Sequence, residues 1–261
     1  AAQEQAVIAL GNLAHGNADN IAAIALAGAI EPLVALLRSG SAWVQEEAAA
    51  VLGHLAAAMA LIELGNTVVP RAVIELGNTV GNNEDSQDAI ARAGAIEPLV
   101  ALLHSGSETA QENAALTLFS LTSRNSGNQL AIARAGAIEP LVVMLRSGKE
   151  QAAAALTNLA ANADNREAIA RAGAIEPLVA MLRHGIKQAI LVLGFLASSA
   201  DTLAAFAEED NLNSLMAWAR DDSAVGSEAA AHLLRALAAN SVEIKRAINR
   251  AGGVGPQGRL I

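Results

Sequence analysis

One stretch of the sequence recurs along this chain and constrains its fold more than any other feature. It reads AIARAGAIEPLVALL from Ala89 to Leu103, and it returns nearly unchanged from Ala131 and from Ala168. A shorter copy begins at Ile24. A stretch that occurs four times cannot be a single active site. It indicates a structural unit that is stacked along the chain.

Each copy predicts the end of one helix and the start of the next. A glycine such as Gly94 follows the apolar run Ala-Ile-Ala, and glycine adopts the left-handed conformation that ends helices without steric cost. Glu-Pro follows shortly after. Proline suits the first helical turn because its missing N–H is not needed there, and glutamate complements the helix dipole. A second glycine such as Gly106 ends this helix, and an alanine-rich helix follows from about Gln111. The unit is therefore a short, a medium and a longer helix.

The length of the unit follows from its marker positions. These are Gly28, Gly94, Gly136, Gly173, Asp210 in a degenerate copy, and Gly252. Their spacings are 66, 42, 37, 37 and 42 residues. The unit resembles the armadillo repeat: it has three helices, the sequence pattern AGAIxPLVxLL, and LxNLA in its third helix. The resemblance covers nearly the whole chain and implies an all-α fold, a right-handed α-solenoid of stacked three-helix repeats.

We expect one solenoid over residues 1–261, because no Pro/Gly/Ser linker or composition break divides the chain. IELGNTV occurs twice, only twelve residues apart, which indicates an irregular repeat, and the polar residues 81–88 are predicted to form a loop with a helix cap. Both ends fall inside repeats, which indicates a fragment or ends that neighbouring subunits cover. The predicted segments are a partial repeat (1–15), a repeat (16–55), a degenerate or partly deleted repeat (56–80), three repeats (81–123, 124–161 and 162–199), a divergent repeat (200–240) and a truncated repeat (241–261).

Composition agrees with a helical repeat protein. Hydrophobic residues make up 53% of the chain and aromatic residues only 2%, so alanine and leucine fill the interior and suit close helix packing. The longest uncharged stretch, Ala48 to Ile62, is too short to cross a bilayer, so we expect no membrane insertion. Cysteine is absent, so the redox compartment stays undetermined. No targeting segment is visible, so the localisation stays undetermined: the cytoplasm or nucleus is favoured, and an organelle is the alternative.

The exposed face of the third helices is the predicted binding surface. Counted from the position of the family's asparagine, positions 0, −4, −7 and −8 share the side opposite the core. Stacking turns them into an acidic edge, an amide row and a mildly apolar floor. An extended or helical peptide can lie there, its backbone bonded by amides and its Lys or Arg by carboxylates. The predicted partner-binding residues are Asn12, Glu47, His54, Glu112, Asn113, Leu116, Ser120, Glu150, Gln151, Asn158, Gln188 and Leu191.

A second explanation of this surface stays open. Glutamate in a first turn is favoured by the helix dipole alone, so the acidic edge is also explained by helix-end chemistry and solubility. In the family, the asparagine position often binds a partner's backbone. Only Asn12 and Asn158 retain asparagine clearly there.

Comparison with the binding grooves of better-known armadillo proteins limits the kinds of partner that we expect. Importin-α-like adaptors carry tryptophan four residues before that asparagine, whereas this chain has residues such as Ala50 and Leu116 there, so its groove is not importin-α-like. Trp43 and Trp218 lie elsewhere in their repeats and are predicted to serve packing. β-catenin-like proteins use a basic groove for acidic ligands, but this chain has a net charge of −9. An acidic groove favours a basic partner segment.

The sequence contains little that points to catalysis. The five histidines fall in different repeats without HxxxH or HExxH spacing, and no phosphate-binding glycine motif follows a strand, so we expect no metal, no cofactor and no enzyme. The negative charge disfavours nucleic acid. The sequence therefore predicts a non-enzymatic scaffold that binds another protein. The alternatives are a structural subunit of a large multiprotein assembly and the interaction module of a larger enzyme, such as a ubiquitin ligase.

Overall fold

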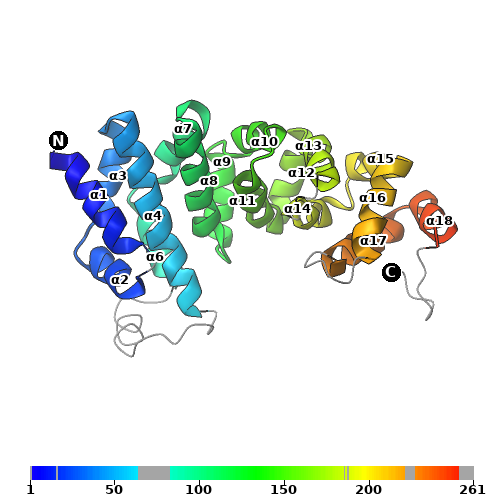
Figure 1. The fold of residues 1–261 in the computed structure, drawn as a ribbon, viewed down its shortest axis with the longest axis horizontal. Coiled ribbons are helices and arrows are strands. Elements are labelled where there is room, and N and C mark those ends of the chain that lie inside the picture. The colour runs from blue at the N-terminus through cyan, green and yellow to red at the C-terminus, as the bar shows by residue number, and fades with distance from the viewer. Residues whose placement is uncertain are drawn as a thin grey trace. The chain divides into compact units, whose positions relative to one another are not determined.

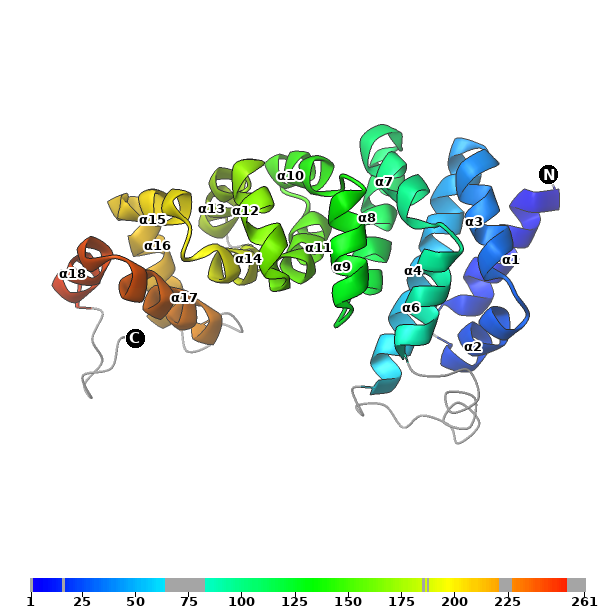
Figure 2. The same ribbon diagram turned by 180° about the vertical axis from the view of Figure 1, so that it is seen from behind.

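The computed structural model describes residues 2–15, 17–63, 83–184, 186, 188–220 and 227–252. Over these residues the chain forms seventeen helices and no strand, as the predicted all-α fold requires. The helices group into two compact units, Ala1–Pro140 and Leu141–Ile261, and the boundary falls inside α10. Each unit is described by itself, and its helices can be followed in Figure 1 and Figure 2.

The first unit repeats an order of first, second and third helix. Its first helices are α2, α6 and α9, its second helices are α3, α7 and the start of α10, and its third helices are α1, α4 and α8. The helix bounds are α1 (Ala2–Ala14), α2 (Ala18–Leu26), α3 (Ile30–Ser39), α4 (Ala42–Glu63), α6 (Asn83–Arg92), α7 (Ile96–Ser105), α8 (Glu108–Thr122), α9 (Ser126–Arg134) and α10 (Ile138–Arg146).

The second unit continues the same order, with α11, α14 and α17 as third helices. The bounds are α11 (Glu150–Ala161), α12 (Ala163–Arg171), α13 (Ile175–Arg183), α14 (Gln188–Leu196), α15 (Ala200–Ala207), α16 (Glu209–Arg220), α17 (Ser227–Asn240) and α18 (Val242–Arg250). The 37-residue spacings have a visible cause. α11 and α14 have 12 and 9 residues, against 15 in α8, so the missing residues shorten the third helix.

The marker glycines end the first helices as the sequence predicts. Gly94 has a φ of 80°, which a side chain disfavours. Its N–H donates to the carbonyl of Ala91 (2.9 Å), and the N–H of Ala95 donates to Ile90 (3.3 Å). These two bonds form a Schellman motif, which satisfies the last carbonyls of the helix. The same pair of bonds and a positive φ recur at Gly28, Gly136 and Gly173.

The core lies where second helices pack against third helices. α3 packs on α4, α7 on α8 and α13 on α14. In α7, Leu99, Val100 and Leu103 are buried, and α13 buries Leu178 and Leu182 in the same register. Each fully buried leucine or valine contributes about 1.5–3 kcal/mol. Burial of this apolar face therefore orients the opposite face of every third helix outward.

Buried amides tie two of the first helices, α9 and α12, to the third helix before them. Asn128 donates from Nδ2 to the carbonyl of Leu121 (3.0 Å), and Asn165 makes the equivalent bond to Leu159 (3.0 Å). Both asparagines are buried. Each bond reaches a carbonyl in the last turn of a third helix, where the carbonyls lack the usual N–H partner four residues further on. The carbonyl of Leu159 also accepts from the N–H of Asn162 (3.2 Å). The turn between repeats is thereby fixed.

An arginine at the end of a second helix reaches the next repeat. Arg38 in α3 donates from Nη2 to the carbonyl of Gly94 (2.8 Å), which lies at the end of α6. In the second unit, Arg220 in α16 makes the same kind of bond to the carbonyl of Ala251 (2.8 Å), after α18. These guanidinium groups satisfy carbonyls at helix C-termini, where the helix dipole also favours positive charge.

The irregular region differs from the prediction in two ways. α6 begins at Asn83, so most of the predicted loop 81–88 is helical. The helix also makes a tertiary contact that the sequence did not predict. Gln87 is buried and donates from Nε2 to the carbonyl of Ser120 in α8 (2.8 Å). α4 continues to Glu63, past the predicted end of its repeat. Residues 64–82, which hold most of the doubled IELGNTV stretch, lie outside the described residues.

Candidate functional site

Third helices lie next to one another within each unit. In the first unit α4 packs against both α1 and α8, and the views in Figure 1 and Figure 2 agree that α4 and α8 run side by side. In the second unit α14 packs against both α11 and α17. All twelve predicted partner-binding residues lie on these helices: seven in the first unit and five in the second.

Small residues allow α4 and α8 to approach closely. Thr117 in α8 donates its hydroxyl to the carbonyl of Ala49 in α4 (2.8 Å). A Cβ placed on Gly53 would lie 2.8 Å from the Thr117 hydroxyl oxygen, which is closer than real Cβ contacts. Only glycine fits there without a shift, so the spacing of these two helices is set by sequence.

Four predicted residues of the first unit lie at least partly in solvent. Asn12 in α1 is exposed, and Glu47 in α4 and Glu112 in α8 are half-buried. Leu116 in α8 is 43% exposed, which is high for a leucine in a packed helix. This side of the helices therefore offers carboxylate, amide and apolar surface.

Two other predicted residues form hydrogen bonds to backbone carbonyls of the third helices themselves. Asn113 donates from Nδ2 to the carbonyl of Glu46 in α4 (3.3 Å), so one of its donors links α8 to α4. Ser120 is buried, and its hydroxyl donates to the carbonyl of Leu116 (3.0 Å) one turn earlier in the same helix. Ser120 therefore presents little surface to a partner.

His54 is half-buried in α4 beside His15, with the two rings edge to face at 5.8 Å between centroids. Burial, and next the neighbouring His15, lower the pKa of His54 below its usual 6.5. Its Nδ1 atom is buried and has no hydrogen-bond partner among the described residues. His54 is therefore neutral at pH 7 and contributes a mostly apolar ring at the position of the family's asparagine.

In the second unit, the predicted residues come from α11 and α14. Glu150 is exposed and begins α11, and Gln151 and Asn158 are half-buried on the same helix. Gln188 is half-buried and begins α14, and Leu191, one turn further on, is 51% exposed. Leu191 stands at the same position of its helix as Leu116 does in the first unit.

A depression between α14 and α17 adds residues that the predicted set omitted. Its volume is about 500 Å³, and Leu191, Phe195, Glu228, His232 and Ala236 are among its lining residues. Phe195 stands at the family's asparagine position and is 36% exposed. The helical spacing placed Phe195 on this side, but its apolar character kept it out of the predicted set.

Trp43 is more exposed than the sequence predicts. The sequence predicts a packing role for Trp43, but this side chain is 41% exposed in the first turn of α4. It lies eleven residues before His54, close to three helical turns, and therefore on the same side of the helix. The sequence alone did not show that α4 begins as early as Ala42, which brings Trp43 into the helix. Trp218 is half-buried in α16, a second helix.

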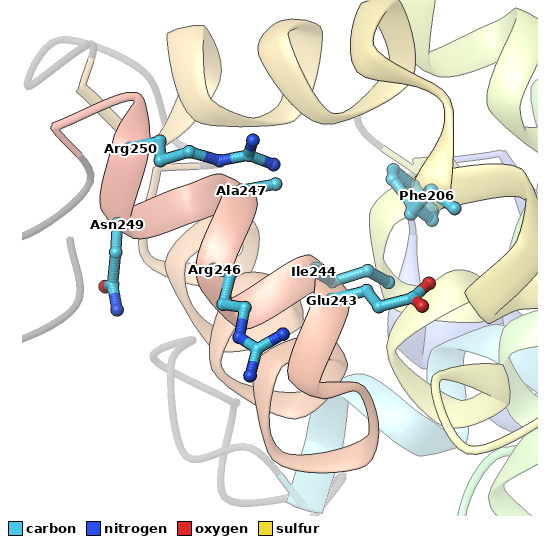
Figure 3. A pocket seen from close by; sticks show the side chains of 8 residues that line it. Phe206, Glu243, Ile244, Arg246, Ala247, Asn249 and Arg250 are labelled. Atoms are coloured by element: carbon cyan, nitrogen blue, oxygen red, sulfur yellow. The ribbon is translucent and has the colours of Figure 1, made fainter.

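Another cavity lies between α15 and α18, away from the third helices. It measures about 620 Å³. Figure 3 shows Glu243 and Ile244 extending from α18 toward Phe206 of α15, with Arg246 and Arg250 on the same helix. Among the described residues, those that line this cavity all lie on α15 and α18. It therefore does not belong to the candidate site.

The described residues contain no group of three or more His, Asp or Glu side chains placed to hold a metal ion. Within the same part of the chain, no helix is both long and apolar enough to span a membrane.

Three-helix repeats with stacked third helices define an α-solenoid. The Armadillo/beta-catenin-like repeat family matches residues 17–57 and 83–123. Both matched ranges contain one first, one second and one third helix of the first unit. Together with the structural similarities below, this match shows that the chain belongs to the armadillo-repeat family.

Similar solved structures include designed proteins. A designed armadillo repeat protein aligns with a TM-score of 0.72 and 26% identity over 90% of this chain and 92% of its own. An engineered protein aligns at 0.69 and 30% identity over 94% and 90%. A designed armadillo repeat protein in complex with the peptide (KR)4 aligns at 0.69 and 26% identity over 89% and 92%. No curated protein matches the chain. The armadillo fold is typical of non-enzymatic, peptide-binding interaction scaffolds.

Proposed function

We propose that this chain is a non-enzymatic scaffold that binds an extended, basic segment of another protein on the exposed side of its third helices. The observation that carries the proposal is the recurrence of the same surface in both units. Leu116 and Leu191 occupy equivalent positions and are both largely exposed. Glu112 lies on the same third helix as Leu116, α8. Glu150 begins α11, the third helix that packs against the helix of Leu191, α14.

Charge supports a basic partner. The chain carries a net charge of −9, and third helices begin with glutamate in several repeats. Lys and Arg side chains can pair with such carboxylates, while amide side chains such as Gln151 bond an extended backbone. A structural relative binds (KR)4, which is a peptide of this kind.

A charge reversal with a matched control tests this proposal. Glu150 and Glu176 are both exposed glutamates in the first turn of a helix of the second unit, so reversal to lysine costs both helices the same dipole interaction. Only Glu150 lies on a third helix. Affinity for fluorescently labelled (KR)4 is measured by anisotropy at several salt concentrations, because exposed charges are screened by salt.

We expect Glu150→Lys to weaken binding about fivefold or more, because it replaces an attraction by a repulsion. Glu176→Lys changes the net charge equally and should weaken binding clearly less. Equal losses in both variants would mean that only overall charge matters, and the proposed site would then be wrong.

A further inference from the structure

We infer that the depression between α14 and α17 binds one large apolar side chain of the partner segment, beside a basic residue of that segment. This inference rests on the proposed function and adds to it a specificity that charge alone does not give. The depression lies wholly in the second unit, between two adjacent third helices.

The hollow exists because small residues stand where larger ones would fill it. Gly194 has no side chain, and a Cβ built on it would meet nothing within 4 Å. Ala236 on α17 is equally small. The walls are apolar, with Leu191 and Phe195 both reaching solvent. A space of about 500 Å³ with such walls can accept a leucine-sized side chain, whose transfer from water is favourable.

The aromatic wall is held in place before any partner binds. The guanidinium carbon of Arg166 lies 5.5 Å from the centroid of the Phe195 ring. Arg166 is itself fixed, because it donates to the carbonyls of Ala160 (2.8 Å) and Ala161 (3.1 Å). A cation above an aromatic face is attracted to it. The ring is therefore oriented in advance, which reduces the entropy lost on binding.

A carboxylate on the rim of the depression favours a cationic residue beside the occupant. Glu228 lies in the first turn of α17 and lines the depression, and His232 follows one turn later. The carboxylate favours a cationic residue next to the apolar anchor. A purely basic segment would leave the apolar walls in water, whereas an apolar residue between basic ones would cover them. The occupant is therefore an apolar anchor flanked by Lys or Arg.

Two peptides of equal charge test the inference on the full chain. Both derive from (KR)4, with the fourth residue changed to leucine in one and to serine in the other. We expect the leucine peptide to bind about tenfold or more tightly than the serine peptide, since burial of one leucine side chain supplies this difference.

Substitutions at Gly194 provide the matched variants. Gly194→Leu places a large side chain in the lining of the depression, and it should remove the advantage of the leucine peptide while the serine peptide binds as before. Gly194→Ala adds one methyl group in open space and should keep the advantage. Circular dichroism checks that each variant is folded.

The outcomes separate this inference from the proposed function. Equal affinity of the two peptides for the unchanged protein, or an advantage that survives Gly194→Leu, would overturn the apolar anchor and leave a charge-selective groove. If neither peptide binds, the proposed function fails as well.

Discussion

Replacement of Gly94 by alanine probes the contact that joins two repeats. Gly94 has a φ of 80°, and a Cβ there would collide with Nη2 of Arg38, the same atom that donates to the Gly94 carbonyl. Gly136 is the matched control, because its φ is 89° and a Cβ would meet nothing within 4 Å. Both positions lie in the first unit and end a first helix in the same way.

The two substitutions share one cost and differ by another. An alanine in the left-handed region costs about 1–2 kcal/mol at either position. At Gly94 the guanidinium of Arg38 must also move away and lose its hydrogen bond. That bond is exposed, so its loss adds only about 0.5–1 kcal/mol. We therefore expect Gly94→Ala to destabilise the protein by about 1.5–3 kcal/mol, and Gly136→Ala by about 1–2 kcal/mol.

Urea unfolding followed by circular dichroism measures the difference, provided that the variants show equal m-values. In an Arg38→Ala background the bond is already absent, so Gly94→Ala should cost the same as Gly136→Ala. The reasoning would be refuted if Gly94→Ala cost no more than Gly136→Ala, or if its extra cost persisted without Arg38.

Three further predictions follow from the packing. Asn128→Ala should destabilise the protein by about 1–3 kcal/mol in urea unfolding, because it leaves a third-helix carbonyl without its buried donor; a loss below about 0.5 kcal/mol would contradict this. Gly53→Ala should lower the melting temperature because its Cβ would meet Thr117, whereas Gly194→Ala, in open space, should raise it through better helix propensity; a rise in both would contradict the close approach. The lowered pKa of His54 means that the unfolded chain binds its proton more readily, so stability should fall as pH drops below 6.5, and His54→Gln should flatten this part of the pH profile; an unchanged profile would contradict it.

The repeated helix ends were predictable from sequence because their causes are local. A glycine at a left-handed position, a proline in the first turn and an apolar face each act within a few residues, so Gly94 and the helix from Ile96 could be predicted without tertiary information. Contacts between repeats could not. Arg38 reads as an ordinary C-terminal cation, and its partner at Gly94 is separated by 56 residues.

The candidate site was predictable to the extent that helical phase determines it. The phase placed Leu116 and Leu191 on the exposed side, and both lie there. It could not show that Ser120 is buried against its own helix, or that α4 starts early enough to place Trp43 on that side. Whether these surfaces bind a partner stays a prediction.

Site-specific photo-cross-linking tests the central claim most directly. A benzophenone amino acid replaces Leu191 on the third helix α14, or Val143 on the second helix α10, which is 60% exposed and serves as the control. Both residues lie in the second unit. With labelled (KR)4 present, the account predicts cross-links from position 191 and few from position 143. Equal yields, or a yield from position 143 alone, would contradict binding on the third helices.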